Sequence, residues 1–421
     1  MMALQSCRKI INTVLVERKH FFSYIPLNKY DETCFNLLKS RIKFSGPLTV
    51  YDYMKEVLTN PVSGYYVTKN SIGKQGDFIT SPEISQLLGE MVALWTLNEW
   101  TKLGSPKPLQ LVELGPGKGS MMHDILRVYK RLKLDESISV HFVEVSDELS
   151  KVQGNKLCTS VLKHNNKTYY QEGRTENNVP IFWHKAIQDV PKTFTCILAH
   201  EFFDALPVHI LKQTVDGWRE VLIDLTECGT KLCYVISSGP TPACVFSKYS
   251  NGREYFEISP QSGLILEHIA CMLEEHGGFA LIVDYGHNGE KKDTFRGFRN
   301  HKLVDPLEAP GSSDLTADVD FTFLKNVTND KLLSFGPVSQ RSFLKQLHID
   351  IRLQVLLKSC KNEKEKNDIL SGYHMIMDTD KMGECFKVMS LFPVVLKEFF
   401  NDFPVDTPGL KRLRNCCDSC S

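Results

Sequence analysis

The sequence predicts an α/β fold whose core is a mostly parallel, doubly wound sheet. Two observations support this prediction. Apolar, strand-like runs alternate with helical stretches through the middle of the chain, and acids follow most of these runs. The first run, at 109–114, leads into the glycine-rich turn GPGKG at 115–119, and the helical stretch MMHDILRVYKRLK comes after it. A buried strand that stops at a glycine turn and opens a helix is typical of a nucleotide-type cofactor site.

The first 30 residues are basic, with Glu17 as their single acid. Their basic residues are Arg8, Lys9, Arg18, Lys19 and Lys29. An apolar stripe lies opposite them and consists of Ile10, Ile11, Val14 and Leu15. A basic amphipathic start is typical of a mitochondrial presequence, and we assign residues 1–35 to it. A plain flexible N-terminus is the alternative interpretation.

Residues 36–105 predict a helical N-terminal part. One helix is expected within 45–66. A second is expected to begin at Ser81, because its hydroxyl can cap a helix, Pro82 suits the first helical position and Glu83 places an acid in the first turn. Apolar residues then recur at helical spacing, which predicts packing in the core: Ile84, Leu87, Leu88, Met91, Val92 and Trp95.

The glycine turn predicts binding of a cationic cofactor. Gly115, Gly117 and Gly119 permit positive φ and let a ligand approach the backbone with no Cβ in the way. Glu113, just before the turn, favours S-adenosylmethionine, whose amino group and sulfonium are positive, over NAD, whose pyrophosphate it would repel. Ser120 stands where the dinucleotide pattern G-x-G-x-x-G has its third glycine. A tight turn without a ligand is the alternative interpretation.

The next two strands add candidate cofactor contacts. The strand expected at 139–146 carries Glu144 about 20–30 residues beyond the glycine turn, which is the spacing of a ribose-binding acid. A hydrogen bond of that kind contributes about 1.5–3 kcal/mol. A third strand, expected at 181–191, leads to Gln188 and Asp189, which we add to the cofactor-binding candidates. In the alternative interpretation, Glu144 is a solvated strand end.

The fourth strand, within 193–211, predicts the catalytic side of the site. Its apolar run ends at His200, Glu201 and Asp204. Two carboxylates at one strand end match the planar, five-donor fork of a guanidinium, which they can orient and whose proton they can accept. His200 is either a base in the site or a core histidine. In the alternative interpretation, Asp204 caps a helix or turn and Glu201 pairs with a buried arginine.

From residue 106 to residue 393, the chain divides into three predicted parts. Residues 106–212 form the cofactor-binding core, residues 213–260 form a β-rich insertion, and residues 261–393 form the remaining sheet and the C-terminal helices. Ligands of doubly wound sheets bind outside the carboxyl ends of the strands. We therefore expect one crevice to hold the acids at the predicted strand ends: Glu113, Glu144, Asp189, Glu201, Asp204 and Asp284.

The segment DLTADVDF contains three acids, Asp314, Asp318 and Asp320. It lacks the spacing and the glycine of an EF-hand loop, so we expect no metal site. Asp318 precedes an apolar run, and we expect it to cap the helix that follows.

Composition narrows the class of protein. The chain has 421 residues, of which 42% are hydrophobic and 24% charged, as in globular proteins. Its 50 basic residues balance 50 acidic ones, so no overall field favours nucleic acid. No apolar run approaches the roughly 18 residues of a membrane span. The 13 cysteines are irregularly spaced, which predicts thiols in a reducing compartment.

Six segments, taken in order, carry a family resemblance: GDFITSPEISQLLGE, VELGPGKGSMMHDILR, HFVEVS, AHEFFDALPVH, GGFALIVDYGH and APGSSDLTADVDF. Over about residues 40–393 the chain resembles the MidA family of mitochondrial and bacterial methyltransferase-like proteins. Within that family it resembles the mitochondrial protein-arginine methyltransferases that serve complex I assembly. Residues 394–421 form a divergent tail that lacks the closing segment expected of the family.

The resemblance implies a class I S-adenosylmethionine-dependent methyltransferase fold, a Rossmann-like doubly wound sheet. It also implies symmetric dimethylation of an arginine on a complex I subunit in the mitochondrial matrix. By position, residues 113–119 match the cofactor loop, Glu144 matches the ribose acid and residues 201–207 match the catalytic face. A methyltransferase for another substrate, and an assembly chaperone that retains a cofactor site without catalysis, are the alternatives.

Overall fold

The computed structural model describes residues 29–68, 81–134, 137–165, 167–300 and 302–402. Most of the predicted presequence, most of the divergent tail and the start of the GDFITSPEISQLLGE segment lie outside these ranges. The described chain begins with helices and one short strand: α2 (Lys29–Ser45), β1 (Leu48–Thr49), α3 (Val50–Thr59), α4 (Tyr65–Thr68), α5 (Ser81–Ile84) and α6 (Gln86–Lys102).

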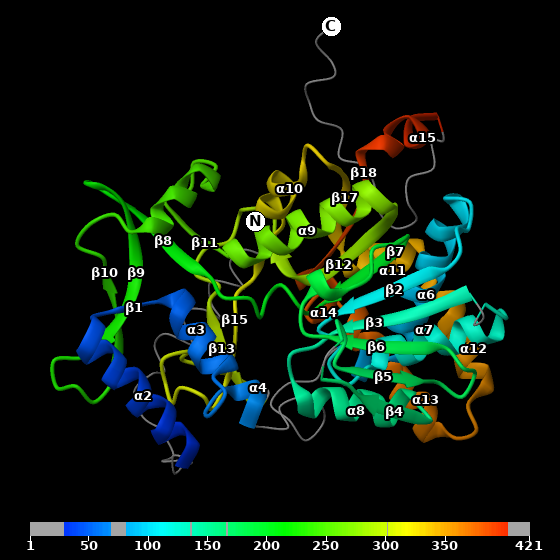
Figure 1. Cartoon of the computed structure of the whole chain (residues 1–421), viewed down its shortest axis with the longest axis horizontal. Helices are drawn as coiled ribbons and strands as arrows, with labels where there is room; N and C mark the ends of the chain where they lie inside the picture. The colour runs from blue at the N-terminus through cyan, green and yellow to red at the C-terminus, as the bar shows by residue number, and fades with distance from the viewer. Residues whose placement is uncertain (1–28, 69–80, 135–136, 166, 301, 403–421) are drawn as a thin grey trace, which may run out of the picture.

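The larger sheet has ten strands within the described residues (Figure 1). Nine lie in the order β17-β18-β12-β7-β2-β3-β6-β5-β4, and the tenth, β16, pairs with β12. The strands are β2 (Leu109–Leu114), β3 (Ile138–Val143), β4 (Ser160–Lys163), β5 (Gln171–Arg174), β6 (Pro180–His184), β7 (Thr195–His200), β12 (Gly278–His287), β16 (Val319–Asp320), β17 (Leu332–Ser339) and β18 (Phe386–Pro393).

The centre of this sheet is parallel. Strands β12, β7, β2, β3 and β6 all run in one direction, and Leu111 of β2 pairs with Val140 on one side and Cys196 on the other. This confirms the predicted α/β fold with a mostly parallel sheet. The outer strands are antiparallel, β18 against β12 and β17, and β5 against β6 and β4.

Helices cover both faces of the larger sheet (Figure 1). Along β2, Leu109 and Leu111 pack with α6, α7 and the C-terminal helices, whereas Val112 and Leu114 pack with α9 and α10. This division follows from the alternation of side chains along a strand. The remaining helices are α7 (Ser120–Arg131), α8 (Asp147–Leu157), η2 (Ile187–Asp189), η3 (Pro242–Tyr249), α9 (Pro260–His276), α10 (Phe321–Thr328), α11 (Gln340–Gln346), α12 (Ile349–Ser359), α13 (Glu363–Met377), α14 (Met382–Cys385), η4 (Val394–Leu396) and α15 (Lys397–Asp402).

Two smaller antiparallel sheets complete the described structure. The five-stranded one has the order β1-β9-β8-β11, with β10 beside β9, and its strands after β1 are β8 (His209–Thr214), β9 (Gly217–Leu225), β10 (Leu232–Ile236) and β11 (Tyr255–Ile258). It thus recruits β1 from the N-terminal part. The three-stranded one consists of β13 (Arg296–Arg299), β14 (Lys302–Val304) and β15 (Asp314–Thr316).

The helix expected from Ser81 onward is divided in two, so the prediction was wrong at this point. α5 ends at Ile84, and α6 begins after Ser85, whose hydroxyl accepts a hydrogen bond from the amide of Leu87 at 3.3 Å. Ser85 is therefore the residue that caps the long helix. Ser81 makes its own bonds to a distant side chain, and a tertiary partner of that kind leaves no local signal.

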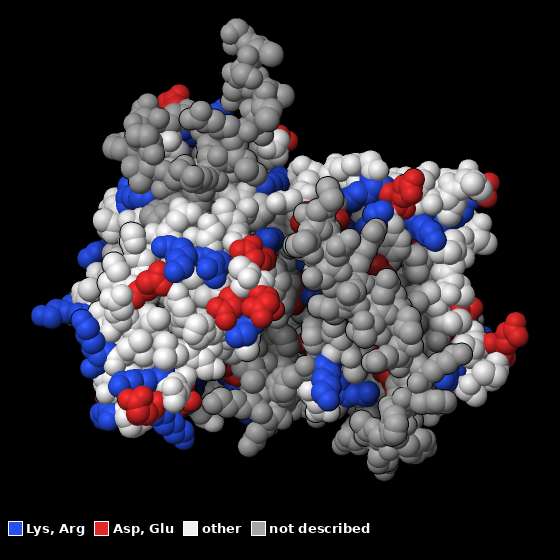
Figure 2. All heavy atoms as spheres, turned by 180° about the vertical axis from the view of Figure 1, so that it is seen from behind, with Lys and Arg blue, Asp and Glu red and all other residues white. Residues whose placement is uncertain are grey.

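The described surface carries charges of both signs. On the face shown in Figure 2, Lys and Arg side chains are interspersed with Asp and Glu side chains. None of the described helices combines the length and the apolar composition that crossing a bilayer requires. Of the described cysteines, Cys196, Cys233 and Cys271 are free thiols.

Candidate functional site

The glycine turn, residues 115–119, has the backbone that its glycines predict. Gly115, Gly117 and Gly119 have φ of 62°, 53° and 73°, which is the left-handed region. Gly119 is also the N-cap of α7. A Cβ at Gly115 would come within 3.0 Å of the Phe202 ring. The glycine turn and the chain segment that follows β7 are therefore in direct contact.

Glu113 is buried on β2 just before this turn. Burial raises the pKa of its carboxyl to about 8, and the charge of Lys156 partly opposes the shift. Its Oε2 atom is buried and has no hydrogen-bond partner among the described residues. A buried carboxylate oxygen without a partner is costly, whereas a cationic ligand would supply the missing donor and favour the charged form. These residues fit a positively charged cofactor.

Glu144 follows β3, which ends at Val143, earlier than the sequence predicts. Its Oε1 accepts a hydrogen bond from the amide of Ser146 at 2.7 Å, and its Oε2 accepts one from the Gln153 amide at 3.0 Å. Gln153 also donates to the carbonyl of Gly117 at 2.6 Å, so one side chain joins the glycine turn to the predicted ribose acid. Sequence reasoning missed Gln153, whose position on α8 carries no motif.

Gln188 and Asp189 lie on η2 after β6, which ends at His184, also earlier than predicted. Gln188 is exposed and Asp189 is half-buried. Since β6 is parallel to β3, both residues lie at the same sheet edge as Glu144.

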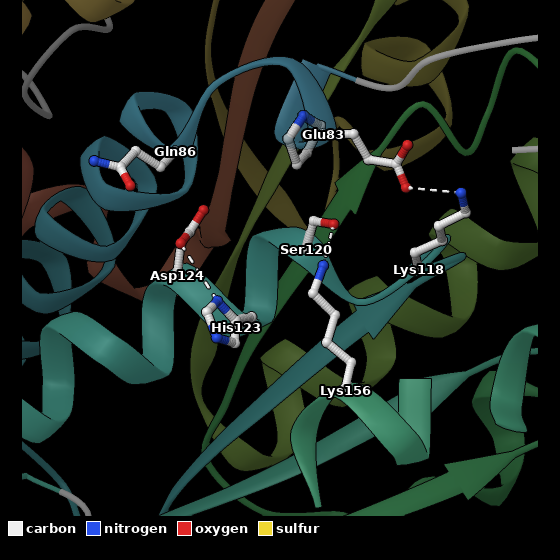
Figure 3. Close-up of a pocket in the computed structure, with 8 residues that line it drawn as sticks. Glu83, Gln86, Lys118, Ser120, His123, Asp124 and Lys156 are labelled. Carbon is white, nitrogen blue, oxygen red and sulfur yellow. Dashed lines mark hydrogen bonds and ion pairs between the residues drawn. The ribbon is translucent and has the colours of Figure 1, made fainter. Parts of the chain in front are cut away.

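A cavity of about 640 Å³ opens beside the glycine turn (Figure 3). Three polar contacts join residues of its lining: Lys118 pairs with Glu83 of α5 at 3.7 Å, Lys156 donates to the Ser120 hydroxyl at 2.6 Å, and Nδ1 of His123 lies 3.5 Å from Oδ1 of Asp124. The first of these contacts ties α5 to the glycine turn. The whole lining is Pro82, Glu83, Gln86, Lys118, Ser120, His123, Asp124 and Lys156.

Residues 201–204, which we call the acidic turn, leave β7 in a strained conformation. Glu201 has φ of 51°, which is uncommon for a residue with a side chain and costs about 1–3 kcal/mol. The turn wraps around Asp284 of β12, whose Oδ2 accepts hydrogen bonds from the amides of Phe202, Phe203 and Asp204 at 3.1, 2.9 and 3.4 Å. Asp284 therefore holds the backbone of the turn.

The carboxylate of Glu201 is bound on one side only. Its Oε1 accepts hydrogen bonds from the amide and the hydroxyl of Ser81, both at 2.9 Å. Its Oε2 is buried and has no partner among the described residues. Burial raises the pKa of this carboxyl to about 8, with Asp204 and Asp314 adding to the effect. Its partner is thus Ser81 and not the buried arginine of the alternative interpretation.

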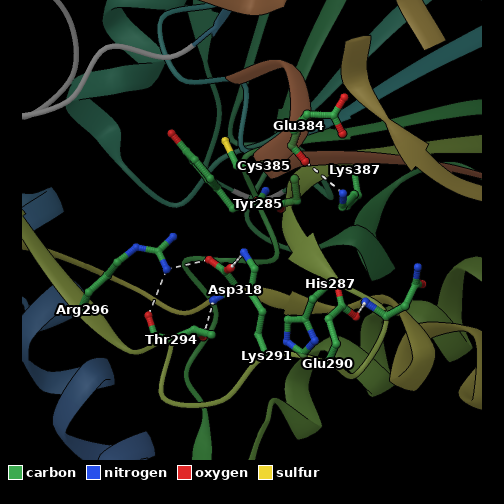
Figure 4. Close-up of polar contacts among 12 residues, drawn as sticks. Tyr285, His287, Glu290, Lys291, Thr294, Arg296, Asp318, Glu384, Cys385 and Lys387 are labelled. Carbon is green, nitrogen blue, oxygen red and sulfur yellow. Dashed lines mark hydrogen bonds and ion pairs between the residues drawn. The ribbon is translucent and has the colours of Figure 1, made fainter. Parts of the chain in front are cut away.

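Asp204 lies among charged side chains. Its pKa is raised to about 6, chiefly by burial; the guanidinium of Arg296 lowers it and Asp318 raises it. Figure 4 shows Arg296 and Lys291 converging on Asp318, at 2.6 and 2.5 Å. The carbonyl of Asp204 accepts a hydrogen bond from the amide of Ala317 at 3.1 Å. The segment that carries Asp318 therefore packs against the acidic turn.

His200 is the last residue of β7 and is buried. Burial lowers its pKa to about 3, so the ring is neutral. It stacks on Phe386 with ring centroids 5.9 Å apart, and its Nδ1 lies 3.5 Å from Oε1 of Glu201. The ring packs in the core and borders the proposed site at the same time.

The three acids of DLTADVDF have separate partners. Asp320 caps α10 by accepting hydrogen bonds from the amides of Thr322 and Phe323, at 3.0 and 3.2 Å. The expected cap at Asp318 was therefore wrong, because two cations hold that carboxylate instead. Asp314 accepts a hydrogen bond from the Tyr66 hydroxyl at 2.7 Å. Among the described residues, no group of His, Cys, Asp and Glu side chains is arranged to hold a metal ion.

Comparison with known proteins identifies the family. A family model described as "Putative S-adenosyl-L-methionine-dependent methyltransferase" matches residues 91–338, more than half of the chain. The protein arginine methyltransferase NDUFAF7, mitochondrial, of Danio rerio is 48% identical over 361 residues, which cover 84% of this chain and 85% of the relative. The chain belongs to this family. The Homo sapiens protein of the same name is 46% identical, over 85% of this chain and 82% of its own length.

Family membership confirms the resemblance to the MidA methyltransferases and the assignment of S-adenosylmethionine as cofactor. A COG1565 superfamily member from Burkholderia thailandensis, solved with S-adenosyl-homocysteine bound, superposes with a TM-score of 0.71 at 20% identity. That comparison covers 88% of this chain and 95% of the other, and it confirms the class I fold. The chain is thus an S-adenosylmethionine-dependent methyltransferase of a mitochondrial family.

Proposed function

We propose that this methyltransferase symmetrically dimethylates an arginine on a complex I subunit in the mitochondrial matrix. The observation that carries the proposal is the buried carboxylate of Glu201, one oxygen of which has no partner among the described residues. The backbone of Glu201 is strained, and the acidic turn that carries it contacts the glycine turn. The acids around Glu201 support a cationic acceptor. Besides burial, Asp204 and Asp314 raise the pKa of Glu201, and Asp204 and Glu201 raise the pKa of Asp284, so these carboxyls lie close to one another. The names of the relatives state protein arginine methylation.

The proposed catalytic residues Glu201 and Asp204 have complementary tasks. Bound S-adenosylmethionine supplies a methyl group on a positively charged sulfonium. Glu201 would accept a hydrogen bond from the guanidinium through Oε2 and take up the proton that the nitrogen loses when it gains the methyl group. Asp204 would hold a second N–H of the same fork. A guanidinium favours the ionised form of both carboxylates. Alignment of this kind contributes roughly 7–11 kcal/mol to catalysis.

The proposed donor side consists of Glu113, the glycine turn and Glu144, with Gln188 and Asp189 at the sheet edge. Glu113 would pair with the positive charge of the cofactor through Oε2, which has no partner among the described residues. Glu144 retains acceptor capacity for ribose hydroxyls, since Ser146 and Gln153 occupy one site on each of its oxygens. His200 would stay neutral and border Glu201.

The decisive experiment incubates the purified protein with S-adenosylmethionine and complex I subunits and measures intact mass and arginine derivatives. We expect one subunit to gain two methyl groups, placed symmetrically on one arginine. Methylation of another kind of side chain would establish a different substrate. Tight cofactor binding without turnover on any subunit would instead support a chaperone role.

Replacing Arg296 by methionine should move the acidic limb of the pH–rate profile upward by about one pH unit. The guanidinium lowers the pKa of Asp204, and it also neutralises Asp318. Without it, the Asp204 carboxyl holds its proton to higher pH, so activity near neutrality falls and returns at alkaline pH. Arg299→Met is the matched control, because Arg299 lies on the same strand and bonds to Ser312 instead. Identical profiles for the two variants would argue against this role.

We also propose that residues 1–35 are a mitochondrial presequence, on the strength of their basic, acid-poor composition. Residues 1–30 fused to a fluorescent reporter should direct it into mitochondria. Arg8→Glu together with Lys9→Glu should reduce import several-fold, because the double change replaces two positive charges with negative ones. Imaging and fractionation measure the outcome, and a reporter that stays in the cytosol would refute the assignment.

A further inference from the structure

Ser81 is the described residue that lies closest to the carboxylate of Glu201, which we propose binds the acceptor arginine. Both of its donors, the backbone amide and the hydroxyl, lie 2.9 Å from Oε1 of Glu201. Ser81 is fully buried, and 120 positions of sequence separate it from Glu201. Two donors on one oxygen fix the rotation of the carboxylate. The other oxygen, Oε2, has no partner within the described ranges of the chain.

The helix that carries Ser81 is anchored independently of the acidic turn. Glu83 of α5 pairs with Lys118 of the glycine turn at 3.7 Å (Figure 3). On the other side, Gly372 of α13 packs so closely that a Cβ there would lie 2.8 Å from the carbonyl of Ile84. The Ser81 hydroxyl also lies 3.5 Å from the sulfur of Met382. Ser81 therefore reaches Glu201 from a fixed support.

We propose that Ser81 is a positioning residue: by occupying Oε1 of Glu201, it directs Oε2 toward the acceptor nitrogen. This inference rests on the proposed function, in which Glu201 binds the acceptor arginine.

The same contacts predict a pH effect. Hydrogen bonds to the ionised carboxylate lower its pKa, and the two bonds from Ser81 have this effect on Glu201. Among the described residues, the other titratable groups that face Glu201 are His200, Asp204, Asp284, Tyr285 and Asp314. Removing the hydroxyl leaves those groups in place and raises the pKa of Glu201. Activity that needs ionised Glu201 then requires a higher pH.

The test compares Ser81→Ala with Ser81→Thr, which keeps a hydroxyl, and with Ser85→Ala as matched control. Ser85 lies four residues away and caps α6 without contacting Glu201. For Ser81→Ala we expect kcat to fall about 10-fold or more, KM for the subunit and cofactor affinity to stay near wild type, and the pH–rate limb to move upward. Ser81→Thr should restore much of kcat. Unchanged kcat and pH profile in Ser81→Ala, or equal losses in Ser85→Ala, would overturn the proposal.

A double-variant cycle separates this inference from the proposed function and does not depend on the folding of Ser81→Thr. If Ser81 acts through Glu201, Ser81→Ala should cause little further loss in a Glu201→Gln background. If the losses caused by Ser81→Ala and Glu201→Gln are fully additive, the positioning role of Ser81 is refuted, whereas the proposed function is not. Near-normal turnover of Glu201→Gln by itself would refute the carboxylate model of the proposed function.

Discussion

Replacing Glu201 by glutamine is expected to lower methyl transfer by at least about 100-fold while leaving the affinity for S-adenosylmethionine near wild type. The change keeps the volume of the side chain and removes its charge. Oε2 of Glu201, which has no partner in the described part of the chain, would accept a hydrogen bond from the guanidinium. A neutral amide can neither stabilise that cation nor take up its proton. A loss of about 100-fold corresponds to about 2.7 kcal/mol of transition-state stabilisation. Single-turnover methylation and calorimetry measure the two quantities separately.

Glu99→Gln is the control for removing a buried carboxylate. Glu99 is also buried and its pKa is also raised by burial, but it lies near the far end of α6. It should retain wild-type turnover. If Glu201→Gln and Asp204→Asn both keep near-normal dimethylation, the carboxylate model is wrong. If both variants lose cofactor binding, the two carboxylates belong to the donor side. Asp284 would then be a weak substitute, because three backbone amides occupy one of its oxygens.

The parallel centre of the sheet could be predicted because its signals are local. The β2 strand, the glycine turn and α7 follow one another within about 25 residues, and each has the periodicity or residue type that its backbone requires. The pairing of β1 with β9 has no such signal. Leu48 and Ile223 are register partners from distant parts of the chain, and a two-residue strand is too short to show a pattern.

In the candidate site, too, the residues with a local sequence signal could be predicted and those that depend on distant partners could not. The acids at strand ends could be selected from the sequence because ligands of this sheet class bind there, and the structure does bring Glu201, Asp204 and Asp284 together. The sequence could not distinguish their surroundings. Asp284 binds backbone amides, Asp204 faces Arg296, and Glu201 faces Ser81. Gln153 and Ser81 were missed as site residues for one reason: each acts through a side chain distant in sequence, while its local context matches an ordinary helix.

Replacing Gly117 by valine is expected to abolish measurable binding of S-adenosylmethionine while the protein stays folded. Gly117 has φ of 53°, and a β-branched residue at that angle is strained by about 1–3 kcal/mol. The valine either displaces the turn or projects its methyl groups where the cofactor meets the backbone. The turn also presents the Gly117 carbonyl to Gln153, so its displacement would disturb the side chain that holds Glu144.

Gly229→Val separates strain from binding. Gly229 has φ of 65°, lies in the connection between β9 and β10, and has open space where a Cβ would stand. Both variants should lose stability to a similar extent in thermal unfolding, because the backbone cost is alike. Only Gly117→Val should lose the calorimetric signal of cofactor binding. Unchanged affinity in a folded Gly117→Val protein would mean that the cofactor does not lie against the glycine turn. The contact between Gly115 and Phe202 would then no longer place the acidic turn beside the methyl donor.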